Sequence, residues 1–164
     1  MKKLFLTIMM SMILLLSSLT INAQVAETSL SVTGGYSWIN GVIGAEYRVN
    51  QFALSGGWMP TTMPMSGDKI NSFGFTFTAY SGKPSDISTW YASFGIASQG
   101  YREETSSNYG YSDYLTAPMY VVMVGDRYDF GKAYMKLGIG YGWCEYAGTF
   151  AWEALIGFPL FKNY

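Results

Sequence analysis

Four charged residues lie inside segments that otherwise alternate between bulky apolar and small polar residues: Glu46, Arg48, Lys136 and Glu153. All four fall on the parity opposite the bulky residues, so they share the polar face of their segments. If that face is enclosed, each charge needs a partner, because an unpaired buried charge is costly. The pattern therefore predicts a salt-bridge network inside the fold. The simplest interpretation is that this network has a structural role, and a more specific hypothesis is that it forms a gate in a narrow pore.

The other residues that could take part in catalysis do not form a catalytic set. The chain has no histidine, which removes the commonest general base, the Ser-His-acid arrangement and His-based metal sites. The glycines of LGIGYGW (137–143) recur at period two along a strand, so they are not a nucleotide-binding loop. The Glu103-Glu104 pair lies in a polar loop, and the lone Cys144 is read as a packed thiol. We expect no catalysis, no cofactor and no metal.

Eight alternating segments must position these charges. In the fourth, NSFGFTFTAY (71–80), Phe73, Phe75 and Phe77 alternate with Gly and Thr. The seventh (132–143) has the cleanest alternation, and its apolar residues alternate mainly with glycines. Such alternation is typical of β-strands with two different faces. Only the sixth segment (117–130) is apolar on both parities, so its orientation is not fixed by pattern. No segment shows convincing helical periodicity.

The composition of the polar face indicates which side is wet. It is dominated by Gly, Ser and Thr, whereas the water-exposed surface of a soluble protein carries many long charged side chains. Charged residues make up only 13% of the chain, against about 25% in typical soluble domains. Small residues suit the narrow interior of an eight-stranded barrel. The bulky face should then point toward lipid, including Phe73, Phe75, Phe77, Leu137 and Ile139.

The tryptophans are consistent with a membrane barrel. Four lie on the apolar parity near one end of the expected meander, and one lies at the other end; they are Trp38, Trp58, Trp143 and Trp152, and then Trp90. Aromatic girdles are expected where a barrel meets the two membrane–water interfaces. The alternative reading is large core residues of a soluble barrel. We predict an all-β fold, an eight-stranded antiparallel up-and-down transmembrane β-barrel.

The N-terminus, the charge balance and the lengths of the connections give further indications. Lys2, Lys3 and the apolar run Leu4–Leu16 before Ala23 are typical of a secretory signal peptide, so we expect residues 1–23 to be removed and residues 24–164 to form the barrel. There is no basic excess that would point to nucleic acid. Two connections, Pro60–Ile70 and Arg102–Tyr114, are long, while the turns at the opposite end are short.

The chain resembles the small eight-stranded outer-membrane β-barrels of Gram-negative bacteria, the OmpX, opacity-protein and OmpA membrane-domain type. The resemblance rests on the signal peptide, the eight segments and the stretch APMYVVMVGDRYDFGKAYMKLGIGYGW (117–143). It implies export through the general secretion pathway, insertion by the outer-membrane assembly machinery, and contact with outer-membrane lipid and lipopolysaccharide. It also implies a porin-like, monomeric cell-envelope protein with a role in membrane integrity, adhesion or recognition.

Several alternatives remain open at this stage. The loop 102–114 is Tyr- and Ser-rich, as recognition loops are, although a solvated spacer has the same composition. A small passive pore is the second functional hypothesis, and a secreted soluble barrel that binds an apolar ligand is the third.

Pro159 cannot donate a ladder hydrogen bond, so we expect the eighth strand to end near Phe158.

Overall fold

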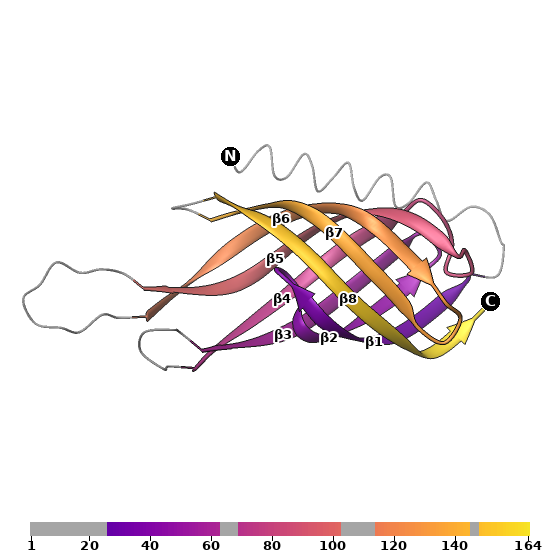
Figure 1. The fold of residues 1–164 in the computed structure, drawn as a ribbon, viewed down its shortest axis with the longest axis horizontal. Coiled ribbons are helices and arrows are strands. Elements are labelled where there is room, and N and C mark those ends of the chain that lie inside the picture. The colour runs from indigo at the N-terminus through magenta and orange to yellow at the C-terminus, as the bar shows by residue number, and fades with distance from the viewer. Residues whose placement is uncertain (1–25, 63–68, 103–113, 145–147) are drawn as a thin grey trace, which may run out of the picture.

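The computed structural model describes residues 26–62, 69–102, 114–144 and 148–164, which form eight antiparallel strands closed into one barrel (Figure 1). Each strand pairs with the next along the chain, and β8 pairs with β1 to close the ring. The strands are β1 Thr28–Ser37, β2 Gly41–Val49, β3 Phe52–Thr62, β4 Lys69–Tyr80, β5 Ser88–Arg102, β6 Tyr114–Asp129, β7 Tyr134–Trp143 and β8 Gly148–Asn163. The predicted all-β class and meander topology are confirmed.

The alternation in β4 separates the two faces as the sequence predicts. Phe75 is 69% exposed on the outside of the barrel, and its neighbour Thr76 is 3% exposed inside it. Phe73 is also exposed, whereas Thr78 is fully buried. Because successive side chains of a strand point to opposite faces, one parity of every strand lines the interior. In β4 the interior face is therefore the polar one.

The structure settles the orientation of β6, which the sequence left open. Met119, Val121 and Met123 are buried inside the barrel, while Val122 and Val124 are exposed outside it. The interior consequently contains apolar side chains as well as polar ones.

The eighth strand is longer than we predicted. It runs to Asn163, and its pairing with β1 shifts where Leu30 pairs with Phe161 and Ser31 pairs with Pro159. This β-bulge leaves Leu160 as an extra residue and lets the ladder continue past the proline. The prediction that the strand ends near Phe158 was wrong for this reason.

The two ends of the barrel differ. At one end short turns join β2 to β3, β4 to β5 and β6 to β7. Asn50, in the first of these turns, has a φ of 50°, a conformation that asparagine adopts more readily than most residues. We call this the short-turn end.

At the opposite end, two hairpins continue beyond the closed ring (Figure 1). The pairing of β4 with β5 stops at Gly74 and Ala97, but β3 and β4 remain paired as far as Thr62 and Lys69. The pairs of β5 with β6 likewise reach Arg102 and Tyr114. We call these two extensions, residues 59–62 with 69–72 and 98–102 with 114–118, the projecting ribbons.

Some sequence predictions lie outside the described residues. These are the signal peptide, residues 1–23, and positions 103–113 of the predicted contact loop, which include Glu103 and Glu104. In the part of the chain that is described, no helix is long and apolar enough to cross a membrane.

Candidate functional site

Glu46 is the centre of a buried ionic network inside the barrel. Its side chain, on β2, is 2% exposed. One carboxylate oxygen accepts a hydrogen bond from Arg127 Nη1 at 3.0 Å, and the other accepts one from Lys136 Nζ at 3.2 Å. The hydroxyls of Tyr80 and Tyr134 donate to the same two oxygens, at 2.9 and 3.2 Å. The carboxylate is thus held by two cations and two phenols, which offsets its desolvation.

Lys136 links Glu46 to a second buried carboxylate, Glu153 on β8. The distance from Lys136 Nζ to Glu153 Oε1 is 3.8 Å. The Tyr91 hydroxyl also donates a hydrogen bond to Glu153 Oε1, and Ser37 Oγ donates one to Oε2 at 2.9 Å. Glu153 therefore joins the network to the end of β1.

A further set of ion pairs extends the network to the short-turn end. Arg127 Nη2 lies 3.5 Å from Asp129, and Lys162 Nζ lies 3.3 Å from the same carboxylate. Lys162 also donates to the carbonyl of Gly131 at 2.7 Å, in the turn between β6 and β7. The three carboxylates Glu46, Glu153 and Asp129 are matched by three cations.

Arg48 is placed differently from the other predicted members. It is fully buried, as expected, but its guanidinium donates to the carbonyls of Asn50 and Gly82, at 3.0 and 2.6 Å. It also lies over the Tyr80 ring, 3.9 Å from the centroid. Among the described residues it forms no ion pair with a carboxylate within 4.0 Å. A cation–π contact and carbonyl dipoles stabilise its charge instead.

Sequence reasoning missed much of the network. Glu46, Lys136 and Glu153 come together as the parity argument requires, but Arg127 was overlooked because β6 is apolar on both parities. Asp129 and Lys162 lie at strand ends, where a charge carries no parity signal. The tyrosines Tyr80, Tyr91 and Tyr134 follow the polar parity of their strands, which was the available signal.

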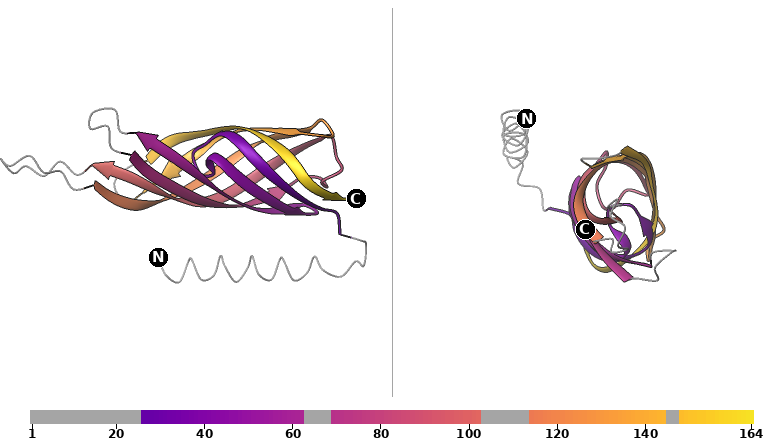
Figure 2. Two further views of the ribbon diagram at one scale, coloured as in Figure 1. Left: turned by 90° about the horizontal axis from the view of Figure 1, so that it is seen from below. Right: turned by 90° about the vertical axis from the view of Figure 1, so that its left-hand side faces the viewer.

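A second interior feature is the turn between β1 and β2, residues 38–40, which folds into the lumen. The right-hand view of Figure 2, from the end with the projecting ribbons, shows the indigo connection between β1 and β2 inside the ring of strands. Ile39 is 3% exposed and packs in a cluster with interior side chains of β5, β6 and β8, namely Ala97, Met119, Val121, Met123 and Ala151. The turn therefore fills part of the lumen and contacts strands on several sides of the barrel. We call residues 38–40 the inward turn.

Hydrogen bonds fix the inward turn, and two glycines leave room for its backbone. Ser37 Oγ accepts hydrogen bonds from the amides of Ile39 and Asn40, at 3.3 and 3.2 Å. Thr76 Oγ1 donates to Asn40 Oδ1 at 2.8 Å. A Cβ added to Gly57 would overlap the carbonyl oxygen of Asn40, and one added to Gly74 would overlap that of Ile39. Glycine is thus required at both positions for close backbone approach.

The inward turn also corrects one tryptophan prediction. Trp58, Trp90, Trp143 and Trp152 are exposed on the outside of the barrel. Trp38 is half-buried and packs against the lumen cluster, because the chain leaves the sheet after Ser37 and turns inward. A pairing irregularity between Gly34 and Ser37 accompanies this change of direction.

The predicted lipid-facing residues all lie on the outer surface. Phe73, Leu137 and Ile139 are exposed, and Phe77 is half-buried because its ring stacks on that of Phe52, with centroids 5.8 Å apart. Cys144, just after β7, is half-buried. No group of three or more His, Cys, Asp or Glu among the described residues could hold a metal ion.

Together, these features define a class: a small closed barrel with a charged, filled interior and an apolar outer wall. The structure has the fold of the small eight-stranded outer-membrane β-barrels. It resembles the N-terminal β-barrel domain of Pseudomonas aeruginosa OprF at a TM-score of 0.53 and 15% identity, over 82% of this chain and 97% of that one. The resemblance inferred from the sequence is confirmed at the level of the fold.

Two further solved structures are similar at lower scores. Neisserial surface protein A matches at a TM-score of 0.49 and 15% identity, over 81% of this chain and 94% of that one. The Yersinia pestis outer membrane protein Ail matches at a TM-score of 0.46 and 12% identity, over 83% and 100% of the two chains. No protein-family model and no curated protein sequence matches the chain.

Proposed function

We propose that this chain is an integral outer-membrane β-barrel protein of a Gram-negative cell envelope, with a structural or surface-contact role and no catalysis. The observation that carries the proposal is the inversion of the barrel relative to a soluble protein: the charged side chains of its ionic network lie inside and most of its large apolar side chains lie outside. Lys136 is 1% exposed inside, whereas Phe75 is 69% exposed outside. In water the outer wall would be a large adhesive surface, but in lipid such a wall is required.

The same inversion argues against a secreted soluble barrel with an apolar ligand in its lumen. Such a protein needs its bulky residues inside, where this barrel holds an ionic network and the inward turn. The filled lumen also argues against a passive pore, because the inward turn and the Glu46 network occupy it at two successive levels. Purified protein in a planar bilayer should therefore show no steady ion conductance.

Cell fractionation tests the proposal. The protein should remain in the outer-membrane fraction after a carbonate wash, and its folded and boiled forms should migrate differently on a gel. Recovery of the folded protein from the soluble periplasmic fraction would overturn the proposal. The expected route is export through the general secretion pathway with removal of residues 1–23, then insertion by the outer-membrane assembly machinery and contact with lipopolysaccharide.

The projecting ribbons support a surface-contact role. Residues 59–62 pair only with residues 69–72, and residues 98–102 pair only with residues 114–118, so both edges of each ribbon lack ladder partners among the described residues. An unpaired edge is a template for strand addition by another chain. We propose that these ribbons and the adjoining loop 102–114 meet partners outside the cell.

An inserted epitope tag tests which side of the membrane the ribbons occupy. A tag placed within residues 103–113 should bind antibody on intact cells. The matched tag in the short turn at residues 82–86 should bind antibody only after the outer membrane is permeabilised. The reverse pattern would place the ribbons in the periplasm and remove the surface-contact role.

A further inference from the structure

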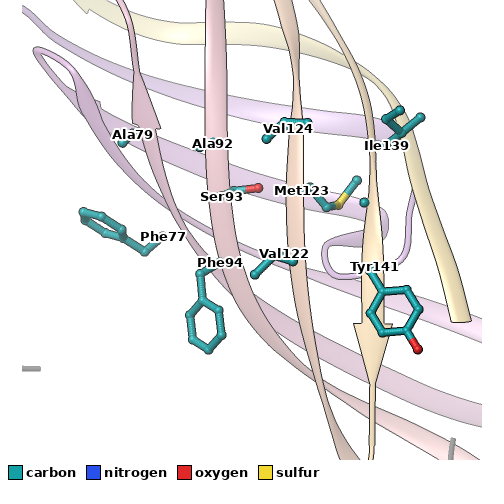
Figure 3. Close-up of a pocket in the computed structure, with 11 residues that line it drawn as sticks. Phe77, Ala79, Ala92, Ser93, Phe94, Val122, Met123, Val124, Ile139 and Tyr141 are labelled. Carbon is teal, nitrogen blue, oxygen red and sulfur yellow. The ribbon is translucent and has the colours of Figure 1, made fainter. Parts of the chain in front are cut away.

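The outer wall of the barrel has an apolar groove that crosses four strands. The groove has a volume of about 490 Å³ and is lined on its outer side by residues of β4, β5, β6 and β7. Figure 3 shows small side chains, Ala79 and Ala92, beside the larger rings of Phe77, Phe94 and Tyr141. This volume lies within the range of about 300–1,000 Å³ that is usual for small-molecule sites.

A carboxylate lies next to this groove on the lipid-facing parity. Asp126 on β6 is two residues beyond Val124, which lines the groove, and it pairs across the sheet with Trp90 and Leu137. Its side chain is exposed. Among the outward-facing strand residues whose side chains the structure describes, Asp126 is the one charged residue. A charge on a membrane-facing wall costs most at the bilayer midplane and least near the interfaces, where headgroups can pair with it.

The depth of Asp126 restricts its surroundings. Tyr128 and Phe130 are exposed and lie still closer to the short-turn end of β6. With Trp90 beside it, the carboxylate therefore falls within the aromatic band, where lipid headgroups meet the apolar wall. Its side chain forms no hydrogen bond or ion pair within the described part of the chain.

Asp126 has no cationic partner among the described residues, and this restricts the kind of molecule that would pair with it. A second copy packed against this wall would bring no cation from its described outward strand positions, which carry none. A lipid with a primary-amine headgroup supplies both an ammonium with three N–H donors for Asp126 and an acyl chain for the groove. We propose that Asp126 and the adjoining groove form a binding site for an aminophospholipid. This inference rests on the proposed membrane location.

Lipid retention tests the site. The protein is inserted into vesicles of phosphatidylethanolamine, phosphatidylcholine and phosphatidylglycerol in equal amounts, extracted in mild detergent, and analysed by native mass spectrometry. Phosphatidylcholine has no N–H donor and phosphatidylglycerol has no cation, so about three to five molecules of phosphatidylethanolamine should be retained for each molecule of either other lipid. This is the scale expected of a partly exposed ion pair.

Matched variants separate the charge from the groove. Asp126→Asn should abolish the enrichment, and Asp126→Glu should restore it. Ala92→Phe should reduce retention of all three lipids by filling the groove, whereas Ala45→Phe, outward-facing on β2 and outside the groove, should have no effect. Insertion of every variant is checked by heat-modifiable gel mobility.

The possible failures are distinguishable. Bound lipids in vesicle proportions, or enrichment that survives in Asp126→Asn, would overturn the lipid site while leaving the membrane barrel intact. Failure of the wild-type protein to insert into any of the vesicles would instead overturn the proposed function itself.

Discussion

Glu46 accepts hydrogen bonds from side chains of three other strands, Tyr80 on β4, Arg127 on β6, and Lys136 and Tyr134 on β7. It therefore fixes the relative positions of strands on different sides of the ring. A buried ion pair contributes little compared with apolar packing, but loss of one partner leaves an uncompensated charge behind. At the residue scale, Glu46 is the side chain on which the interior depends most.

Glu46→Gln should destabilise the folded barrel by about 3–5 kcal/mol, because Arg127 and Lys136 lose their shared carboxylate. Urea unfolding in lipid vesicles measures this change. Glu27→Gln is the control, since Glu27 pairs at 3.6 Å with a half-exposed Lys83 and should cost less than about 1 kcal/mol. Equal losses in the two variants would show that the network does not stabilise the fold.

Phe75→Arg tests the opposite face at the same scale. Phe75 lies near the middle of the apolar wall, so a cation there should cost about 2–4 kcal/mol of membrane stability and impair insertion. The measurement is the fraction of protein inserted into vesicles, scored by gel mobility. Phe75→Leu, which keeps the position apolar, should insert like the wild type. Normal insertion of the arginine variant would mean that Phe75 does not face lipid.

At the element scale, the strands were predictable and the inward turn was not. Alternation over 71–80 and 132–143 identified β4 and β7 and their buried and exposed faces. The turn at 38–40 has no such pattern, because its position depends on contacts with Gly57, Gly74 and Thr76, which lie on other strands. From the sequence, the glycines are predicted only to be small lumen residues, and the structure adds their specific role in close backbone approach.

Gly74→Ala should displace the inward turn, because the added methyl overlaps the Ile39 carbonyl. We expect a loss of about 1–3 kcal/mol, the usual cost of overpacking, together with faster hydrogen exchange of the Ile39 and Asn40 amides. Gly34→Ala is the control: its Cβ would meet only the Val42 carbonyl oxygen, at an ordinary contact distance of 3.9 Å. Unchanged exchange in Gly74→Ala would show that the turn is not held against β4.

At the scale of the whole molecule, the account is that of a barrel with its polar side inside and its apolar side outside. The sequence predicted this arrangement from the Gly, Ser and Thr residues opposite the bulky face. It could not predict the full network, since Arg127 comes from the ambiguous sixth strand and Asp129 and Lys162 from strand ends. It also could not place Trp38, whose parity is overridden when the chain turns into the lumen.

The most direct test is the accessibility of spin labels along β4 in lipid vesicles. Single cysteines are placed at positions 73, 75, 76, 77 and 78 in a Cys144→Ser background, and collision with oxygen and with a water-soluble nickel chelate is measured. Labels at 73, 75 and 77 should show high oxygen and low chelate accessibility, and labels at 76 and 78 should be shielded from both reagents. High chelate accessibility at 73, 75 and 77 would contradict the account, because the phenylalanine face would then lie in water.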